Sequence, residues 1–228
     1  MADGGVQGAA RVDNDGVYIT PAFNQTDVTI LHQAIVQHPL GTLLTTADGL
    51  IEADHLPFVL DTTAGNLGVL RGHVSRSNPV WRTADSAEVL VVFHGAQGYI
   101  SPSWYPSKAV HGRVVPTWNY IVVHARGTLR VIDDAEWLRH HLQTLTDEHE
   151  SRREMPWAVI DAPADYVSAM ITGVVGIEIP LRSLVGKWKL SQNRGPDDRA
   201  GVIGGLKRER AGDPLVDEVL AAEPKTGE

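Results

Sequence analysis

Hydrophobic and polar residues alternate along most of the chain in short runs, a pattern that is typical of half-buried β-strands. The expected strands cover residues 41–46, 50–59, 66–74, 89–93, 117–132, 174–184 and 187–191. Asp48-Gly49 separates the first two strands and predicts a tight hairpin turn. Because turns join most of these strands, with no regular β–α alternation, we expect an antiparallel barrel rather than a parallel sheet.

Helical patterns interrupt this series of strands at three places. Asp27 is positioned to cap a helix that carries apolar residues on one face. Asp133 and Glu136, three residues apart, resemble a capping box for a second helix that reaches about His149. A shorter helix is expected after Pro163. The chain is therefore mainly β with flanking helices, an α+β protein.

Length and composition are those of an ordinary globular chain. The 228 residues are 43% hydrophobic and 21% charged, enough for one large domain or two small ones with a real core. Residues 1–16 are rich in Gly and Ala and are expected to form a flexible leader. Residues 207–228 are charged and rich in Gly, Pro and Ala, and we expect a flexible tail. The domain, with its helical insertions, then covers residues 17–206.

Charge and cysteine content exclude several classes of function. A formal net charge of -8 argues against a chain that binds nucleic acid through general electrostatic attraction to the phosphates. The sequence has no cysteine, which rules out disulfides, thiolate metal sites and a cysteine nucleophile. It also contains no apolar run of about 20 residues and no secretory signal pattern at its start. We therefore expect a cytoplasmic protein with no membrane contact.

Residues 100–120 (I-S-P-S-W-Y-P-S-K-A-V-H-G-R-V-V-P-T-W-N-Y) are the most unusual part of the sequence. Two aromatic groups, Trp104-Tyr105 and Trp118-Asn119-Tyr120, flank a basic loop that contains proline. Indole and phenol groups need hydrogen-bond partners when buried, so this composition suits a half-exposed surface. Such a surface would bind a flat ring with polar edges, or a second subunit. A loop packed beneath two strands explains the composition equally well.

A basic turn follows one of the expected strands, at residues 70–82 (L-R-G-H-V-S-R-S-N-P-V-W-R). Its candidate ligand-binding side chains are Arg71, His73, Arg76 and Asn78. Guanidinium groups match phosphate oxygens well, and Asn78-Pro79 is a favourable start for a helix whose free N–H groups attract anions. Because these arginines interrupt an otherwise acidic chain, we favour phosphate binding over a solvated turn.

A third polar segment, K-W-K-L-S-Q-N-R, occupies residues 187–194. Alternation along a strand places its two lysines on one face. Gln192, Asn193 and Arg194 then add amide and guanidinium donors for the edge of a pyrimidine-like ring or for a phosphate. The same side chains could instead cap a helix that follows Pro196.

The ten histidines are scattered and give no metal-ligand pattern. His140 and His141 are adjacent and point to different sides of one helix, and with His149 they suggest a solvated helix face. We therefore expect no metal-ion site. Among the histidines in strands, His55 and His73 are the better ligand candidates because each lies near a strand end beside polar or basic neighbours.

Six segments occur in an order that resembles the PaiB-like family. They are H-L-P-F (55–58), G-H-V-x-x-x-N-P-V-W (72–81), Y-I-S-P-S-W-Y (99–105), V-P-T-W-N-Y (115–120), V-G-I-E-I (175–179) and K-L-S-Q-N-R (189–194). This family is described as FMN-binding negative transcriptional regulators with a split-barrel fold. The resemblance covers about residues 17–206 and implies an antiparallel split β-barrel, a homodimer, and FMN bound at the subunit interface.

The resemblance also implies a set of cofactor-binding residues. Arg71, His73, Arg76 and Asn78 would lie near the phosphate, Trp118 and Asn119 beside the ring, and Lys189, Gln192 and Asn193 would complete the pocket. A related branch is similar to haem-binding proteins and to piperazate synthases. If haem b is bound instead of FMN, its axial ligand would be His55 or His73.

Two classes of function stay open on this basis. The first is a negative transcriptional regulator that binds FMN as a sensed or structural ligand. Its effect would be indirect, because the sequence shows no helix-turn-helix motif and is acidic. The second is an enzyme, either a flavin-dependent oxidoreductase or a haem-dependent enzyme that forms an N–N bond in a small amine. We favour FMN and the regulator, and the sequence identifies no catalytic residue.

Overall fold

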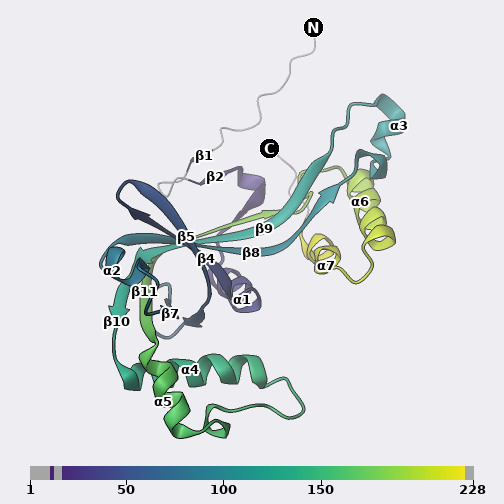
Figure 1. Ribbon diagram of the computed structural model, residues 1–228. Helices are drawn as coiled ribbons and strands as arrows, with labels where there is room; N and C mark the ends of the chain where they lie inside the picture. The colour runs from purple at the N-terminus through teal and green to yellow at the C-terminus, as the bar shows by residue number, and fades with distance from the viewer. Residues whose placement is uncertain (1–10, 13–16, 224–228) are drawn as a thin grey trace. The chain divides into compact units, whose positions relative to one another are not determined.

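The structure, a computed structural model, describes residues 11–12 and 17–223 (Figure 1). Its strands are β1 (Arg11–Val12), β2 (Tyr18–Ile19), β3 (Asn24–Gln25), β4 (Leu40–Ala47), β5 (Leu50–Pro57), β6 (Val59–Asp61), β7 (Val69–Ser75), β8 (Glu88–Ile100), β9 (Thr117–Thr128), β10 (Arg130–Ile132) and β11 (Val174–Lys189). Its α-helices are α1 (Val28–Gln37), α2 (Val80–Thr83), α3 (Ser107–His111), α4 (Ala135–Glu150), α5 (Ala164–Thr172), α6 (Pro196–Glu209) and α7 (Pro214–Ala221).

The described strands form one main sheet and a small second one. The main sheet has nine strands in the order β5-β4-β8-β9-β11-β7-β6, with β10 and β3 also paired to β11. Strands β1 and β2 pair with each other. Neighbouring strands run antiparallel, as in the pairs of β4 with β5 and of β7 with β11. The predicted α+β class with an antiparallel, split-barrel sheet is confirmed.

The chain folds as two compact units. Unit 1 takes residues 1–27, 94–123 and 185–228, as far as these are described, and unit 2 takes residues 28–93 and 124–184. Strands β8, β9 and β11 each contribute residues to both units. Unit 1 therefore contains the aromatic segment (residues 100–120) and the polar segment 187–194, whereas unit 2 contains the basic turn (residues 70–82).

The hairpin of β4 and β5 in unit 2 confirms the predicted turn. Asp48 (φ 51°) and Gly49 (φ 80°) both lie in the left-handed region, as a two-residue turn between twisted strands requires. Next to this hairpin, β4 pairs with β8 from Gly41 to Leu44. Phe58 and Phe93 meet edge to face with ring centroids 5.9 Å apart in the buried core of this unit.

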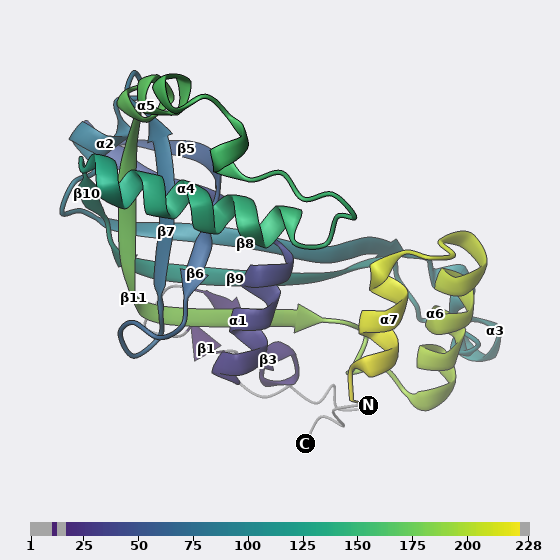
Figure 2. The ribbon, with the colours of Figure 1, turned by 90° about the horizontal axis from the view of Figure 1, so that it is seen from below.

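Helix α4 crosses strands β7 and β11 in unit 2 (Figure 2). The predicted helix is present, but its cap is Asp134 rather than Asp133. The Asp134 side chain accepts a hydrogen bond from the backbone N–H of Trp137, while Asp133 pairs with Arg76. The expectation of a capping box at Asp133 and Glu136 is therefore wrong by one residue at the cap.

Strand β11 is one strand of 16 residues, not the two strands predicted at 174–184 and 187–191. Its last part pairs with β3, where Gly186 and Lys187 face Gln25 and Asn24. The pairing with β3 carries the strand through Gly186, which the hydrophobic pattern marked as a break. The strand ends at Lys189, and Ser191 has a φ of 64°, so the predicted alternation stops before Ser191.

The expected flexible tail from residue 207 is instead helical as far as Ala221. Helix α6 continues to Glu209, and α7 follows after a turn that is capped by Asp213. Figure 1 shows the two helices beside each other in unit 1. Buried residues of α7 and α6 share one apolar cluster with Trp104 and Tyr105. Of the predicted leader, residues 1–10 and 13–16 lie outside the described residues, and Arg11–Val12 forms β1.

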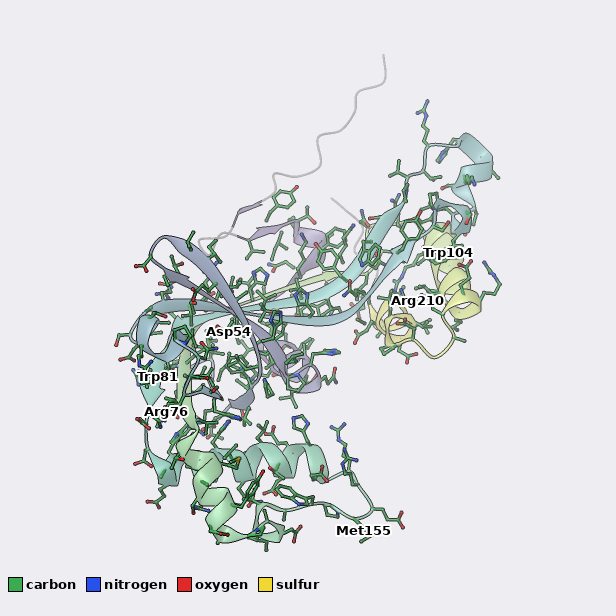
Figure 3. The ribbon with its side chains drawn as sticks, in the orientation of Figure 1. Asp54, Arg76, Trp81, Trp104, Met155 and Arg210 are labelled. Carbon is green, nitrogen blue, oxygen red and sulfur yellow. The ribbon has the colours of Figure 1, made fainter. Side chains whose placement is uncertain are left out.

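The apolar cluster that contains residues of α6 and α7 also explains why the aromatic segment includes Trp104 and Tyr105. Trp104 packs against α6, where Gly201 and Gly205 leave room for its backbone and ring (Figure 3). Its indole N–H donates to Glu209. Trp104 and Tyr105 are therefore core residues of unit 1, as the packed-loop alternative predicted for them. Among the helices of residues 17–223, none combines the length and the hydrophobicity of a membrane span.

Candidate functional site

An exposed aromatic surface lies on strands β8 and β9 of unit 1. Tyr99 and Trp118 meet edge to face with centroids 6.2 Å apart, and they are 47% and 49% exposed. The Trp118 indole N–H donates to the side-chain oxygen of Gln97, 3.2 Å away. On β9, Tyr120 shares the face of Trp118, while Asn119 and Ile121 point to the buried side. Gln97, Tyr99, Trp118 and Tyr120, here called the aromatic face, form a surface with a polar edge, and its two exposed rings are inclined at 65° to each other.

Lysines of β11 adjoin the aromatic face. The Lys187 ammonium lies 5.6 Å from the ring centroids of both Tyr18 and Tyr120, and donates to the Tyr18 carbonyl. The Lys189 ammonium donates to the Thr117 hydroxyl over 2.5 Å. Burial lowers the pKa of Lys189, and the positive charges of Lys187 and Arg194 lower it further. Cations and aromatic rings thus share one surface in unit 1.

The predicted pocket residues Asn119 and Gln192 shape the turn after β11. The Gln192 side chain accepts from the Leu190 N–H and donates to the Trp188 carbonyl, so both ends of its amide are used. The buried Asn119 amide donates to the hydroxyl of Ser191 over 2.9 Å. Gln192 thus holds the backbone of the turn, Asn119 holds the Ser191 side chain, and both are buried. Of the same predicted group, Asn193 is exposed.

Arg71 of the basic turn is held by two carboxylates in unit 2. Its Nε donates to Glu178 over 2.8 Å, and its Nη1 lies 2.9 Å from Asp61. The Asp61 pKa is lowered, first by hydrogen bonds from Thr63 and then by Arg71. The Trp137 indole N–H also donates to Glu178, over 3.2 Å. This network fixes the guanidinium and offsets its charge.

Arg76 and Asn78 are also fully engaged. Arg76 forms a two-pronged pair with Asp133 and donates to the carbonyls of Thr172 and Val174. This pairing raises the pKa of Arg76 and lowers that of Asp133. The Asn78 amide donates to Asp54, and its oxygen accepts the Val80 N–H at the start of α2. That N–H is therefore not free for an anion.

Trp81 stabilises the same turn (Figure 3). Its indole N–H donates to the Arg76 carbonyl, and the guanidinium carbon of Arg82 lies 4.1 Å from its ring centroid. The basic turn is therefore braced by carboxylates and by one indole ring.

His73, a predicted site residue, pairs with His141, which the sequence interpretation placed on a solvated helix face. His73 Nδ1 lies 3.1 Å from His141 Nε2, and the Trp137 ring stacks on His141 at a centroid distance of 5.2 Å. His141 is only 3% exposed, so the expected solvated face is wrong for this histidine. Burial lowers the pKa of His73, and it lowers that of His141 to about 4, with smaller effects from His73, Arg71 and His140. Both rings are therefore neutral at pH 7.

A cavity of about 200 Å³ lies beside this pair in unit 2. Its walls are Val59, Arg71, Trp137, His140, His141 and Thr144. Ligand sites for molecules of cofactor size usually measure about 300–1,000 Å³, so a whole flavin or haem does not fit in it. The open aromatic face of unit 1, by contrast, offers aromatic rings and an amide for the flavin ring, and the adjoining lysines are donors for its phosphate. The residues present fit FMN there.

The predicted ligand candidates His55 and His73 do not form a metal centre with each other. His55 lies exposed on β5, and His73 is the histidine bound to His141. Within residues 11–12 and 17–223, no group of three His, Asp or Glu side chains is placed to hold a metal ion.

The chain belongs to the family described as "Putative FMN-binding domain", which it matches over residues 17–183. It is 32% identical over 194 residues to the protease synthase and sporulation protein PAI 2 of Bacillus subtilis, covering 85% of this chain and 90% of that protein. An uncharacterised protein of Emericella nidulans is 35% identical over 227 residues, covering 84% and 90%. The PaiB-like resemblance is thereby confirmed.

Solved structures support the fold. The flavocytochrome Anf3 from Azotobacter vinelandii aligns with a TM-score of 0.55 at 14% identity, covering 82% of this chain and 80% of that one. The FAD and haem binding protein from Mycobacterium smegmatis aligns with a TM-score of 0.53 at 19% identity, covering 73% of each chain. At these identities the likeness concerns the fold alone.

Proposed function

We propose that this protein binds FMN on the aromatic face of unit 1, at the interface of a homodimer, and acts as an indirect negative regulator of transcription. The observation that carries the proposal is the exposed Tyr99–Trp118 pair with Gln97 at its edge. Half-exposed aromatic rings of this kind are suited to stack on a flat ring and to be covered by a partner subunit. Membership in the FMN-binding family supports the choice of ligand.

The predicted site residues of unit 1 each have a place in this proposal. Trp118 stacks on or beside the flavin ring, Lys189 at the end of β11 donates to the Thr117 hydroxyl beside it, and Asn193 is exposed in the following turn. Asn119 and Gln192 act by holding that turn. A bound flavin would supply one- and two-electron redox chemistry, while the protein supplies stacking, hydrogen bonds and exclusion of water.

In the same proposal the basic turn has a structural role and does not contact the cofactor. Arg76 and Asn78 have their donors committed to Asp133, Asp54 and backbone carbonyls. Arg71 is tied to Glu178 and Asp61. These side chains fix the path of β7 and α2, and they are less suited to a phosphate than unpaired cations are.

Haem binding is the second candidate, with the macrocycle outside the 200 Å³ cavity beside the histidine pair, and one observation favours it. His73 Nδ1 is bonded to His141, which leaves Nε2 of the ring for a ligand. Histidines that bind metals usually have their other ring nitrogen fixed by such a partner. Two solved structures of the same fold are named as a flavocytochrome and as an FAD and haem binding protein. In this case the protein would be a haem-dependent enzyme rather than a regulator.

An indirect regulatory effect is consistent with the charge of the chain. With a formal net charge of -8, the protein lacks the general attraction for DNA that a direct repressor uses. Regulation would then act through the bound flavin, its redox state or a partner protein. A flavin-dependent oxidoreductase stays the alternative within the flavin proposal.

Titration of the cofactor-free protein with FMN, riboflavin and haem, followed by absorption and fluorescence, tests these proposals. We expect stoichiometric FMN binding that weakens about tenfold or more in Trp118→Ala, because base–aromatic stacking contributes about 1–3 kcal/mol. Trp157→Ala is the matched control, since Trp157 is 47% exposed and lies in unit 2. Absence of flavin binding, together with haem binding that is lost in His73→Ala, would replace the flavin proposal with the second candidate.

A further inference from the structure

Positive charge is concentrated in one part of unit 1. Residues 94–123 and 185–194 contain five Lys or Arg and no Asp or Glu, in a chain that has 28 acidic residues. These two segments supply the unit 1 portions of β8, β9 and β11, which carry the aromatic face. The acidic surplus of the chain is therefore absent from the strands that would meet a flavin.

Three of these cations, Lys187, Lys189 and Arg194, come close together at the end of β11. The lysines are two residues apart on one strand, and the turn fixed by Gln192 brings Arg194 back, so that its guanidinium carbon lies 4.8 Å from the Tyr105 ring centroid. Lys189 is partly buried beside Thr117. No ion pair in the described part of the chain involves any member of this cationic triad.

Like charges held together are unfavourable, and partial burial adds to the cost. Asp198, which like Arg194 influences the pKa of the Tyr105 phenol, forms no ion pair with the triad among the described residues. Its carboxylate accepts instead from the N–H and hydroxyl of Ser107. The lowered pKa of Lys189 reflects burial first and then the charges of Lys187 and Arg194. A doubly charged anion placed among the three cations would remove this repulsion and form charge-assisted hydrogen bonds. The triad therefore has the electrostatics of an anion site, whereas Arg71 and Arg76 are already neutralised by carboxylates.

We propose that Lys187, Lys189 and Arg194 bind the phosphate monoester of the flavin, beside the ring that the aromatic face holds. This inference rests on the proposed function and assigns the phosphate to the triad instead of to the basic turn. The Thr117 hydroxyl, next to Lys189, is placed to add a fourth hydrogen bond. Selection of FMN over riboflavin is then a property of the end of β11.

The first test compares FMN with riboflavin in Lys187→Ala/Lys189→Ala. Riboflavin lacks the phosphate, so we expect FMN affinity to fall about tenfold or more per lysine, while riboflavin affinity changes less than about threefold. Lys207→Ala/Arg208→Ala removes two exposed cations from α6 in the same unit and should change neither affinity. The single variant Lys189→Arg keeps the positive charge and should retain most of the preference for FMN over riboflavin.

Two outcomes of this test overturn the inference. One is equal weakening of FMN and riboflavin by the lysine variants, which would show a structural role. The other is a preference for FMN that survives these variants but is lost in Arg71→Gln/Arg76→Gln, which would return the phosphate to the basic turn.

A second test needs no flavin and separates this inference from the proposed function. Inorganic phosphate is titrated into the cofactor-free protein while NMR follows the Lys187, Lys189 and Arg194 side chains. Saturable shifts at these residues that are absent in Lys187→Ala/Lys189→Ala support the triad even if no flavin binds. Shifts confined to Arg71 or Arg76, or no saturable shift at all, contradict it.

Discussion

His140 and His141 are adjacent in α4, yet one is exposed and the other is buried against His73. The sequence did contain a signal for this difference. Trp137, Leu138 and His141 fall at helical spacing on one side of α4, where Trp137 packs on Gly176 of β11 and Leu138 packs with Val167 and Ile171 of α5. A histidine in an apolar stripe belongs to the core side of its helix. What the sequence could not show is that His73 of β7 lies opposite, because that contact joins residues 68 positions apart.

The buried histidine pair predicts how stability depends on pH in the cofactor-free protein. His141 has a pKa of about 4 in the folded state, below the ordinary value of 6.5, so the unfolded chain takes up its proton first. The free energy of unfolding should therefore fall as pH drops from about 6.5 toward about 4, by at most about 3 kcal/mol for this group. Chemical denaturation at a series of pH values measures this slope.

The exposed neighbour supplies the control for this experiment. His141→Gln removes one buried titrating group and should reduce the slope between about pH 6.5 and pH 4, leaving the part that comes from other histidines with lowered pKa, such as His73. His140→Gln removes an exposed imidazole one residue away and should leave it unchanged. An identical slope in wild type and His141→Gln would show that His141 does not titrate as a buried neutral group.

At the scale of elements, predictions based on local chemistry were accurate and those that depended on distant contacts were not. The β4–β5 hairpin was predicted because Asp48 and Gly49 carry the turn within two residues. The continuity of β11 through Gly186 depends instead on pairing with β3, about 160 residues away in the chain. Helix α7 was taken for a tail because its buried residues are few and stand among charges, and only packing against α6 and Trp104 reveals them.

Adjacent glycines of α6 test this packing. A Cβ on Gly205 would lie 2.2–2.6 Å from atoms of the Trp104 ring, whereas a Cβ on Gly204 would meet nothing closer than the end of Arg208, 3.9 Å away. Gly205→Ala should therefore lower the free energy of unfolding by about 1–3 kcal/mol through overpacking. Gly204→Ala should be neutral or raise it by up to about 1 kcal/mol, since Ala favours a helix. Denaturant titration of both variants checks this, and equal effects would contradict the packing of Trp104 on α6.

At the scale of the whole molecule, the predicted site residues divide between the two units. Arg71, His73, Arg76 and Asn78 belong to unit 2, and Trp118, Asn119, Lys189, Gln192 and Asn193 belong to unit 1. Residue types identified these segments as polar and unusual, but they could not show which side chains were already paired. Carboxylates from β6, β11 and the segment before α4 engage the arginines, and no feature of the basic turn itself indicates those partners. From the sequence alone, the lysines of β11 were a weaker phosphate-site prediction than the arginines of the basic turn. Residues 94–123 and 185–194 nevertheless contain no Asp or Glu.

The aromatic face leads to the prediction about assembly. Tyr99 and Trp118 expose about half of their surface, and a subunit partner that covers them would remove a large apolar area from water. We therefore expect a homodimer at micromolar concentration, with an interface on the order of 2,000 Å² or more. Tyr99→Glu places a charge within this face and should shift the protein toward monomer, with weaker FMN binding as a consequence.

Tyr166→Glu is the control, because Tyr166 is 57% exposed and belongs to α5 in unit 2. Light scattering across a dilution series measures the mass, and a wild-type monomer, or a dimer indifferent to Tyr99→Glu, would remove the aromatic face from the interface.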